Sequence, residues 1–248
     1  MIKAKILLLV GIIAYLGFLF LQLPIARALP WLPPQIHVYS ATGTITAGNA
    51  ELVQWRDWRF EKVSWQLQPG SLLTGRLAFA VAFHNADESR GHAEAGVSLQ
   101  QEFSLTNPHA HLKIKALAPA WPMATNLDGW LTADLAYLTW SRTARSLAGR
   151  VTVENVALGG KSALPIGDFV VDLDTKDQTI IGQIADRNAL LAVAGQVTLD
   201  PKGAWQLNAT LAPRAKTPPQ ISRMLAFLPP PDASGQYSLS LGGRLGER

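Results

Sequence analysis

Hydrophobic positions divide this chain into one long apolar run and a much longer alternating part. Ile6–Leu23 is a run of eighteen residues without a formal charge. At about 1.5 Å per residue, a helix of that length spans about 27 Å, close to the roughly 30 Å hydrocarbon core of a bilayer. Lys3 and Lys5 precede the run, and Arg27 is the only formal charge between it and Glu51. This charge distribution predicts a single transmembrane helix with a cytoplasmic N-terminus and an exported remainder.

A cleaved signal peptide is the alternative for the same run. Ala26–Ala28 has the small-x-small spacing of a cleavage site, and Lys3 and Lys5 would form the basic region. The apolar core of a typical signal peptide is about 7–15 residues long, which is shorter than Ile6–Leu23. We therefore expect a retained membrane anchor.

From residue 41 onward, large apolar residues recur at every second position. Leu77, Phe79, Val81 and Phe83 alternate with smaller residues, which is the pattern of a half-buried strand. The same period appears in the segments 63–67, 97–105, 112–117, 129–137, 205–211 and 237–241. The pattern predicts an all-β, antiparallel exported domain with about ten or more strands, built as a sandwich or as a strongly curved sheet.

Turn and helix signals subdivide this β-rich part. We expect turns at Gly48-Asn49 and at Thr106–Pro108, a polar loop over His84–Gly96, and a hairpin around Asp200–Gly203. One short helix is predicted from the spacing of Ile221, Met224, Leu225 and Leu228, with Thr217 as its N-cap. The predicted organisation is a cytoplasmic stub (1–5), a transmembrane helix (6–23), a Pro-rich linker (24–40) and an exported β-rich domain (41–248). The prolines of the linker exclude a regular helix over 29–35.

Composition narrows the classes of function. The net charge of +4 is spread along the chain without a basic stripe, so we expect no nucleic-acid partner. The chain has no cysteine, which excludes thiolate metal sites and a cysteine nucleophile. The sequence contains neither G-x-S-x-G nor H-E-x-x-H. We therefore expect no enzymatic activity, no catalytic residue and no cofactor.

Three sets of polar residues resemble ligand-binding or metal-binding sites, but for each of them we favour a purely structural interpretation. Asn155–Ser162 is one residue away from a phosphate-binding loop, but Pro165 and a further strand follow where a helix is required, which favours a hairpin turn at Gly159-Gly160. His109 and His111 would share one face of a strand, although exposed loop histidines are the favoured interpretation over a metal site. Asp172, Asp174 and Asp177 lack the glycine and terminal glutamate of a calcium loop, and Asp172 and Asp174 alternate as the solvent face of a strand.

An aromatic cluster lies in the first part of the β-rich region, where Trp55, Trp58, Phe60 and Trp65 occur within eleven residues. Such aromatics are most often part of a core, and that is our prediction. A binding platform or a position at the membrane interface is the alternative.

Two segments resemble the type II secretion system protein N family. Val63–Leu77 (VSWQLQPGSLLTGRL) is similar to that family's W-x-L-x-P…L-L-x-G-x-L segment, and Ile221–Leu245 resembles its closing helix, Pro-Asp turn and Gly-led strand. The resemblance implies a non-enzymatic inner-membrane component involved in protein export across the outer membrane. It also implies that the all-β domain (41–248) is periplasmic. The partners it implies are other type II secretion components: the inner-membrane assembly proteins and, as a further candidate, the outer-membrane secretin. Membrane lipid would be contacted through the N-terminal helix.

The same W-x-L-x-P…LL segment is similar, more distantly, to anchored β-proteins of the AsmA type. That likeness implies the alternative function, a lipid-binding or envelope-maintenance protein whose curved sheet holds acyl chains on an apolar concave face. The two hypotheses differ in where Leu77, Phe79, Val81 and Phe83 lie. A second protein layer over them would argue against a lipid groove, and an open trough would favour one.

Overall fold

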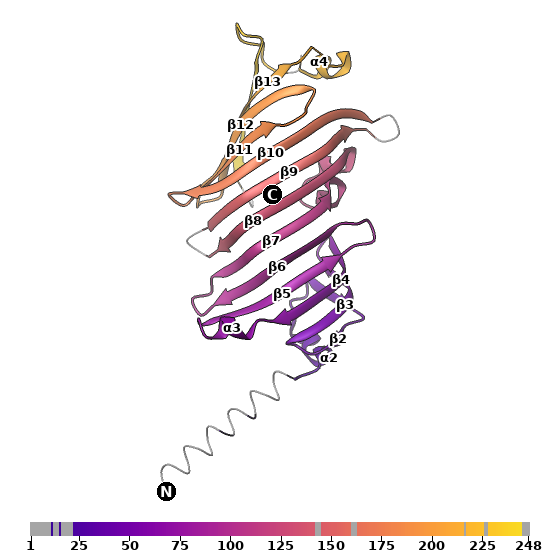
Figure 1. Ribbon diagram of the computed structural model, residues 1–248, viewed down its shortest axis with the longest axis vertical. Helices are drawn as coiled ribbons and strands as arrows, with labels where there is room; N and C mark the ends of the chain where they lie inside the picture. Colours follow the sequence, from indigo (N-terminus) through magenta and orange to yellow (C-terminus); the bar gives the residue numbers. More distant parts are fainter. Residues whose placement is uncertain are drawn as a thin grey trace. The chain divides into compact units, whose positions relative to one another are not determined.

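The structure, a computed structural model, describes residues 22–141, 145–159, 163–215, 217–225 and 228–244, together with Gly11 and Tyr15 (Figure 1). The described residues are mostly antiparallel strands with a few short helical turns, which confirms the all-β prediction. The chain divides into two compact units, Met1–Ala86 and Asp87–Arg248, and each is described by itself.

The predicted transmembrane helix, Ile6–Leu23, lies outside the described residues except for Gly11, Tyr15, Gln22 and Leu23. Among the residues that the structure describes, no helix has the length and apolar character needed to cross a membrane.

The first unit is a small antiparallel sheet. Its elements are α2 (Ile25–Ala28), η1 (Leu29–Trp31), β1 (Ile36–Tyr39), β2 (Thr42–Gly43), β3 (Ala47–Trp55), β4 (Trp58–Leu67), α3 (Pro69–Leu72) and β5 (Arg76–His84). β3 pairs with β4, and β4 pairs with β5. The other edge of β3 carries two short strands, β1 and β2. Within the range expected to be a Pro-rich linker (24–40), the chain thus forms the one-turn helix α2, a 3-10 turn at Leu29–Trp31 and the strand β1.

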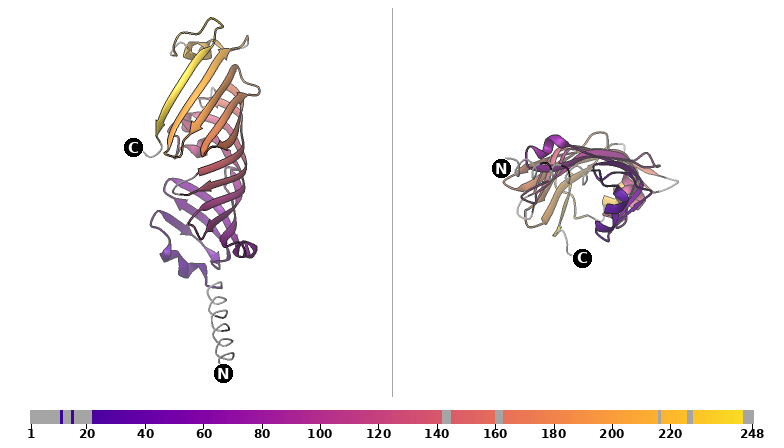
Figure 2. Two further views of the ribbon diagram at one scale, coloured as in Figure 1. Left: turned by 90° about the vertical axis from the view of Figure 1, so that its left-hand side faces the viewer. Right: turned by 90° about the horizontal axis from the view of Figure 1, so that it is seen from below.

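The second unit is a longer antiparallel sheet in which each strand pairs with the next one along the chain. Its strands are β6 (Arg90–Ser98), β7 (Phe103–Lys113), β8 (Leu127–Trp140), β9 (Arg145–Leu158), β10 (Leu164–Lys176), β11 (Thr179–Asp186), β12 (Leu191–Leu199), β13 (Ala204–Pro213) and β14 (Tyr237–Arg244). The 3-10 turns η2 (Ile114–Leu117) and η3 (Pro122–Asn126) separate β7 from β8, and α4 (Pro219–Leu225) separates β13 from β14. Figure 2 shows that this sheet is twisted and curved. Of the two predicted architectures, the second unit thus adopts the curved sheet.

Several boundaries differ from the sequence prediction. The predicted turn at Gly48-Asn49 is wrong, because both residues lie within β3 and the chain turns at Thr44–Thr46. Position 48 has no room for a side chain, because a Cβ there would lie 2.5 Å from the ring of Trp65. The predicted loop over His84–Gly96 is also wrong in its second half, which forms β6.

Thr106–Pro108 does not separate two strands. It lies inside β7, at an irregularity in the pairing with β6 where Asn107 has a φ of 47°. The preceding turn is instead at Leu99–Glu102, inside a segment predicted to be extended. A bulge adds a residue to one strand without ending it, so Pro108 is tolerated where a regular ladder would exclude it. The hairpin at Asp200–Gly203, the short helix and the last strand are confirmed.

Candidate functional site

One row of small and apolar residues runs across the second unit. Its members pair directly across neighbouring strands from β6 to β14; they are Gly91, Ala110, Ala133, Val151, Val171, Ile184, Gly195, Ala209 and Leu239. The next position on each strand forms a polar row: His92, His109, Asp134, Arg150, Asp172, Gln183, Gln196, Asn208 and Ser240. Successive side chains of a strand point to opposite faces. The sheet therefore has an apolar face and a polar face, named here by these two rows.

A second row on the apolar face alternates large residues with glycine over several strands. It consists of Leu135, Gly149, Leu173, Gly182, Val197, Leu207 and Leu241. A Cβ on Gly182 would lie 2.7 Å from Val197 Cγ1 and 3.1 Å from Leu173 Cδ2, so the neighbouring side chains lie over the glycine. No leucine, isoleucine or valine of either row is fully buried, and Leu241 is 48% exposed.

One end of the apolar face is covered by short segments inserted between strands. η2 and η3 place Ile114 and Ala124 against Val156, with Val153 and Phe169 packed around them. The second buried cluster joins α4 to the sheet through Leu191, Ile221 and Leu225, with Val193, Leu211 and Tyr237 packed against it. Among the described residues, these two clusters lie where β8, β10, β12 and β14 begin, and they leave the two apolar rows open.

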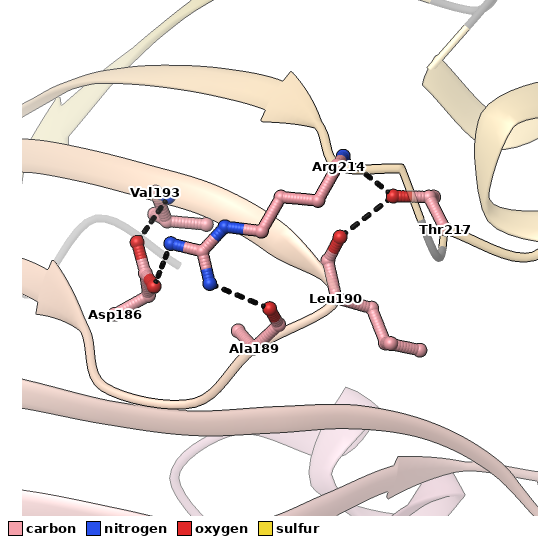
Figure 3. Close-up of polar contacts among 6 residues, drawn as sticks. All are labelled: Asp186, Ala189, Leu190, Val193, Arg214 and Thr217. Atoms are coloured by element: carbon pink, nitrogen blue, oxygen red, sulfur yellow. Dashed lines mark hydrogen bonds and ion pairs between the residues drawn. The ribbon is translucent and has the colours of Figure 1, made fainter.

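A polar clamp holds the segment that leads into α4 (Figure 3). Arg214 Nη2 donates to Asp186 Oδ2 at 2.5 Å, and Nη1 donates to the Ala189 carbonyl oxygen at 2.9 Å. Asp186 Oδ1 accepts the backbone N–H of Val193 at 2.8 Å, so the carboxylate is bonded on both oxygens. The Asp186 side chain is only 11% exposed, and a carboxylate this sheltered needs such partners.

Thr217 belongs to the same clamp, so its predicted role as the N-cap of α4 is wrong. Its hydroxyl donates to the Leu190 carbonyl oxygen at 2.6 Å and accepts the backbone N–H of Arg214 at 2.7 Å. The side chain therefore joins the entry of α4 to the β11–β12 connection. At the start of α4, the backbone N–H groups of Ile221 and Ser222 donate to the Pro218 carbonyl oxygen instead.

The three aspartates lie on or beside the polar face. Asp172 Oδ1 accepts a hydrogen bond from Arg150 Nε at 2.5 Å, and this bond and the charge of Asp172 raise the pKa of Arg150 above its usual value. Asp174 is exposed on the same strand, and Asp177 lies in the β10–β11 turn. The prediction that Asp172 and Asp174 form the solvent face of a strand is confirmed.

The histidines lie in a strand, and the favoured interpretation as loop residues is wrong. His109 and His111 share a face of β7, as the spacing predicts. His109 Nδ1 lies 2.5 Å from Asp134 Oδ1, and His111 Nδ1 lies 2.9 Å from Thr132 Oγ1. The rings of His92 and His109 are 5.3 Å apart, and His111 is stacked on Trp130 at 4.5 Å. In the part of the chain that the structure describes, no group of three or more His, Asp or Glu residues could hold a metal ion.

The strands on either side of the segment similar to a phosphate-binding loop pair antiparallel, as a hairpin requires, but the predicted turn at Gly159-Gly160 lies partly outside the described residues. β9 ends at Leu158 and pairs antiparallel with β10, starting from Leu164. Gly160–Ser162 lies outside the described residues. A strand follows in the place where a phosphate-binding loop needs a helix N-terminus.

The aromatic cluster of the first unit is a surface cluster rather than a core. Trp55 is 50% exposed, and the other three side chains are half-buried. Phe60 is stacked on Trp58 with ring centroids 6.4 Å apart and meets Phe83 edge-on at 5.1 Å. Trp65 Nε1 donates to the Thr44 carbonyl oxygen at 3.1 Å. The prediction of a core is wrong, because none of the four aromatic side chains is buried.

The large residues of β5 also remain partly open to solvent. Leu77 is 49% exposed, and Phe79, Val81 and Phe83 are half-buried. Ala78, which points to the opposite side, is fully buried. Neither of the two buried clusters among the described residues includes these four side chains.

The chain is similar in sequence to a known protein family and to two of its members. The sequence model of the family "Type II secretion system (T2SS), protein N" matches residues 34–240. The chain is 25% identical to type II secretion system protein N of Aeromonas hydrophila, over 94% of this chain and 96% of that protein. It is 24% identical to the protein of the same name from Vibrio cholerae serotype O1, over 86% of this chain and 87% of that protein. No solved structure matches. The chain belongs to the type II secretion system protein N family.

Proposed function

We propose that this chain is a non-enzymatic inner-membrane component of the type II secretion apparatus that acts in protein export across the outer membrane. The observation that supports the proposal is the family match over residues 34–240, which includes the strands from β1 to β13 and the first half of β14. The membrane anchor would be Ile6–Leu23, with the N-terminus in the cytoplasm and residues 41–248 in the periplasm. The partners would be the inner-membrane assembly proteins of the same apparatus and the outer-membrane secretin.

Contacts made by Leu23, the last residue of the predicted anchor, and by Pro24 support retention of the anchor. The backbone N–H of Ile45 donates to the Leu23 carbonyl oxygen at 3.0 Å, and Pro24 forms a β-bridge with Thr44. Cleavage after Ala28 would detach a segment that is hydrogen-bonded to the first unit. Finding a mature chain that begins at Leu29 would contradict the retained anchor.

Deletion of the gene tests the role in secretion. We expect proteins normally secreted by this route to accumulate in the periplasm of the deletion strain, and the intact gene supplied in trans to restore their release. Normal secretion in the deletion strain would contradict the proposal. A periplasmic protein that is not a substrate of the route serves as the control for a leaky envelope.

Labelling of single cysteines tests the topology, because the chain has no native cysteine. We expect Ser222→Cys, an exposed position on α4, to react with a membrane-impermeant maleimide in spheroplasts. Ala4→Cys is expected to react only after the membrane is permeabilised. The reverse pattern would contradict the orientation, and labelling of both positions without permeabilisation would contradict the anchor.

The open apolar rows favour a second candidate function, the binding of lipid acyl chains. Half-exposed Leu, Val and Ile side chains continue across neighbouring strands of the second unit, and Leu77–Phe83 adds a similar series in the first. Photoreactive residues at Val151 and Leu207 would be crosslinked to phospholipid in cells if this function holds, with Asn208 on the polar face as the matched control. Crosslinks to secretion proteins alone would argue against it.

A further inference from the structure

The outer strands of the two units are protected to very different degrees. On the first unit, the outer side of β3 carries only β1, with four residues, and β2, with two, and Pro33 and Pro34 precede β1. Short strands and nearby prolines are common ways in which proteins prevent a sheet edge from pairing with another chain. β14 has neither feature. It runs for eight residues without proline, and its first seven residues, Tyr237–Gly243, carry no charge.

Among the described residues, β14 pairs with β13 alone. It continues both faces of the second unit: Leu239 and Leu241 end the two apolar rows, and Ser240 ends the polar row. The Ser240 hydroxyl donates to Asn208 Oδ1 at 2.9 Å, which fixes this alternation at the edge. A strand added to β14 would therefore need leucine-like residues on one face and small polar residues on the other.

β14 itself meets this requirement when two copies pair antiparallel around Ser240. In that register Ser240 lies opposite Ser240 of the second copy, Leu239 lies opposite Leu241, and Ser238 lies opposite Gly242. Tyr237 would cover Gly243, and Arg244 would face Gln236, so no like charges oppose each other. Directly opposed residues in a sheet point to the same face. Both the apolar and the polar face would thus continue from one copy into the other.

We propose that β14 is a self-association edge, through which two copies of this chain form a two-fold symmetric dimer with one continuous sheet running through the two second units. The pairing joins seven residues of each strand. A register centred on Leu241 also joins seven, but it places Leu239 opposite Gly243 and has one leucine pair, Leu241 with Leu241, instead of two. The interaction depends on backbone hydrogen bonds and on the two Leu239–Leu241 contacts.

Disulfide trapping of the full-length chain tests the proposal. With Ser240→Cys, the two cysteines lie directly opposite each other at a Cα separation of about 4.5–5.5 Å, within the range of a disulfide. Mild oxidation of the detergent-solubilised protein should give a band at twice the 26.8 kDa of the chain. Ser238→Cys is the matched control, because the two copies of residue 238 lie about 14 Å apart in this register, too far to be linked.

The results for the two cysteine variants show whether β14 pairs with a second copy of this chain or with a different protein. Efficient dimer formation by Ser240→Cys and none by Ser238→Cys supports the proposal. Absence of a dimer with Ser240→Cys, or equal linkage of both variants, overturns it. If oxidation in cells instead links Ser240→Cys to a different protein, the edge pairs with a strand of that protein, and the second copy is excluded as its partner.

A charge variant provides a test that does not depend on thiol chemistry. Ser240→Lys places two ammonium groups opposite each other at the two-fold axis and should raise the dimer dissociation constant about twofold to fivefold. Ser238→Lys faces Gly242 and should leave the constant unchanged. Sedimentation equilibrium of the full-length chain measures both, and a monomeric parent protein would refute the dimer outright.

Discussion

The covered end and the open rows of the apolar face are made of the same types of residue but differ in burial. Ile221 and Leu225 of α4 are each 5% exposed, whereas Leu241, in the second apolar row, is 48% exposed. The difference comes from η2, η3 and α4, which lie between strands and, in the part of the chain that the structure describes, pack onto the face at one end. Hydrophobic character alone therefore does not determine which residues stabilise this fold. The covered end supplies a small core, and the open rows leave an apolar surface available for other molecules.

Of the substitutions that test this difference, truncation of Ile221 should lower the stability of the fold most. Ile221→Ala removes a buried side chain from the cluster that holds α4 on the sheet, with an expected loss of about 2–5 kcal/mol in the free energy of unfolding. Urea unfolding followed by tryptophan fluorescence measures it. Ser222→Ala, on the exposed side of the same helix, should change stability by no more than about 0.5 kcal/mol. Equal effects of the two variants would show that α4 does not depend on its apolar contact.

A side chain at Gly149 should have the next largest effect. Gly149 has a φ of 148°, and a Cβ there would lie 2.4 Å from the Asp134 carbonyl oxygen and 2.5 Å from Leu135 Cα. Gly149→Ala should cost about 2–3 kcal/mol, because strain and a clash with backbone atoms add together. Gly159→Ala separates the two terms, since Gly159 also has a positive φ, 87°, but nothing lies within 4 Å of its Cβ position. That control should cost about 1 kcal/mol. A smaller loss at Gly149 than at Gly159 would contradict the close packing of β8 against β9.

Truncation within an open row should matter less for stability. Leu207 is half-buried in the second apolar row, so Leu207→Ala should lower the free energy of unfolding by only about 1 kcal/mol. The same urea experiment measures this value against that of Ile221→Ala. A loss as large as that of Ile221→Ala would mean that the row is covered in solution, and the contrast between the two parts of the face would fail.

The turn between α4 and β14 should respond weakly to acid. Hydrogen bonds to the Asp232 carboxylate, first from the Ser234 hydroxyl and then from the backbone N–H of Gln236, hold the pKa of Asp232 below its usual value. A lowered pKa means that the ionised form stabilises the fold. This contribution should be fully present above about pH 4 and should be lost as the pH falls through the lowered pKa. The stability difference between the parent and Asp232→Asn should therefore shrink on going from pH 7 to pH 3. A constant difference would contradict the assignment.

Local patterns along the chain were sufficient to identify most strands. Alternation predicted the strand around Gly129–Tyr137, the hairpin at Asp200–Gly203 and the last strand, because these depend on residues close in sequence. The pattern failed at His84–Gly96, where the polar residues His92 and Glu94 alternate with small ones and belong to β6. Small residues give a weak hydrophobic signal, although their period of two was present.

Two features of the second unit could not be predicted from local sequence patterns. The apolar and polar rows depend on the register of nine strands, and a shift of one residue between any two of them would move every side chain of a strand to the other face. The clamp between Asp186 and Arg214 joins residues that are 28 positions apart in sequence. No local pattern indicates such a pair.

The amino-acid sequence by itself determined that the β-rich part has strands with one apolar and one polar side, because side-chain alternation is a property of the extended backbone. It also determined the family, through segments such as Val63–Leu77. Only the tertiary structure decided that the alternating sides align across the second unit and that η2, η3 and α4 cover one end of the apolar face. It also decided that, among the residues described, β14 pairs with β13 alone. These features arise from pairing and packing between distant residues, whose free energies depend on register and contact rather than on the order of residues within one strand.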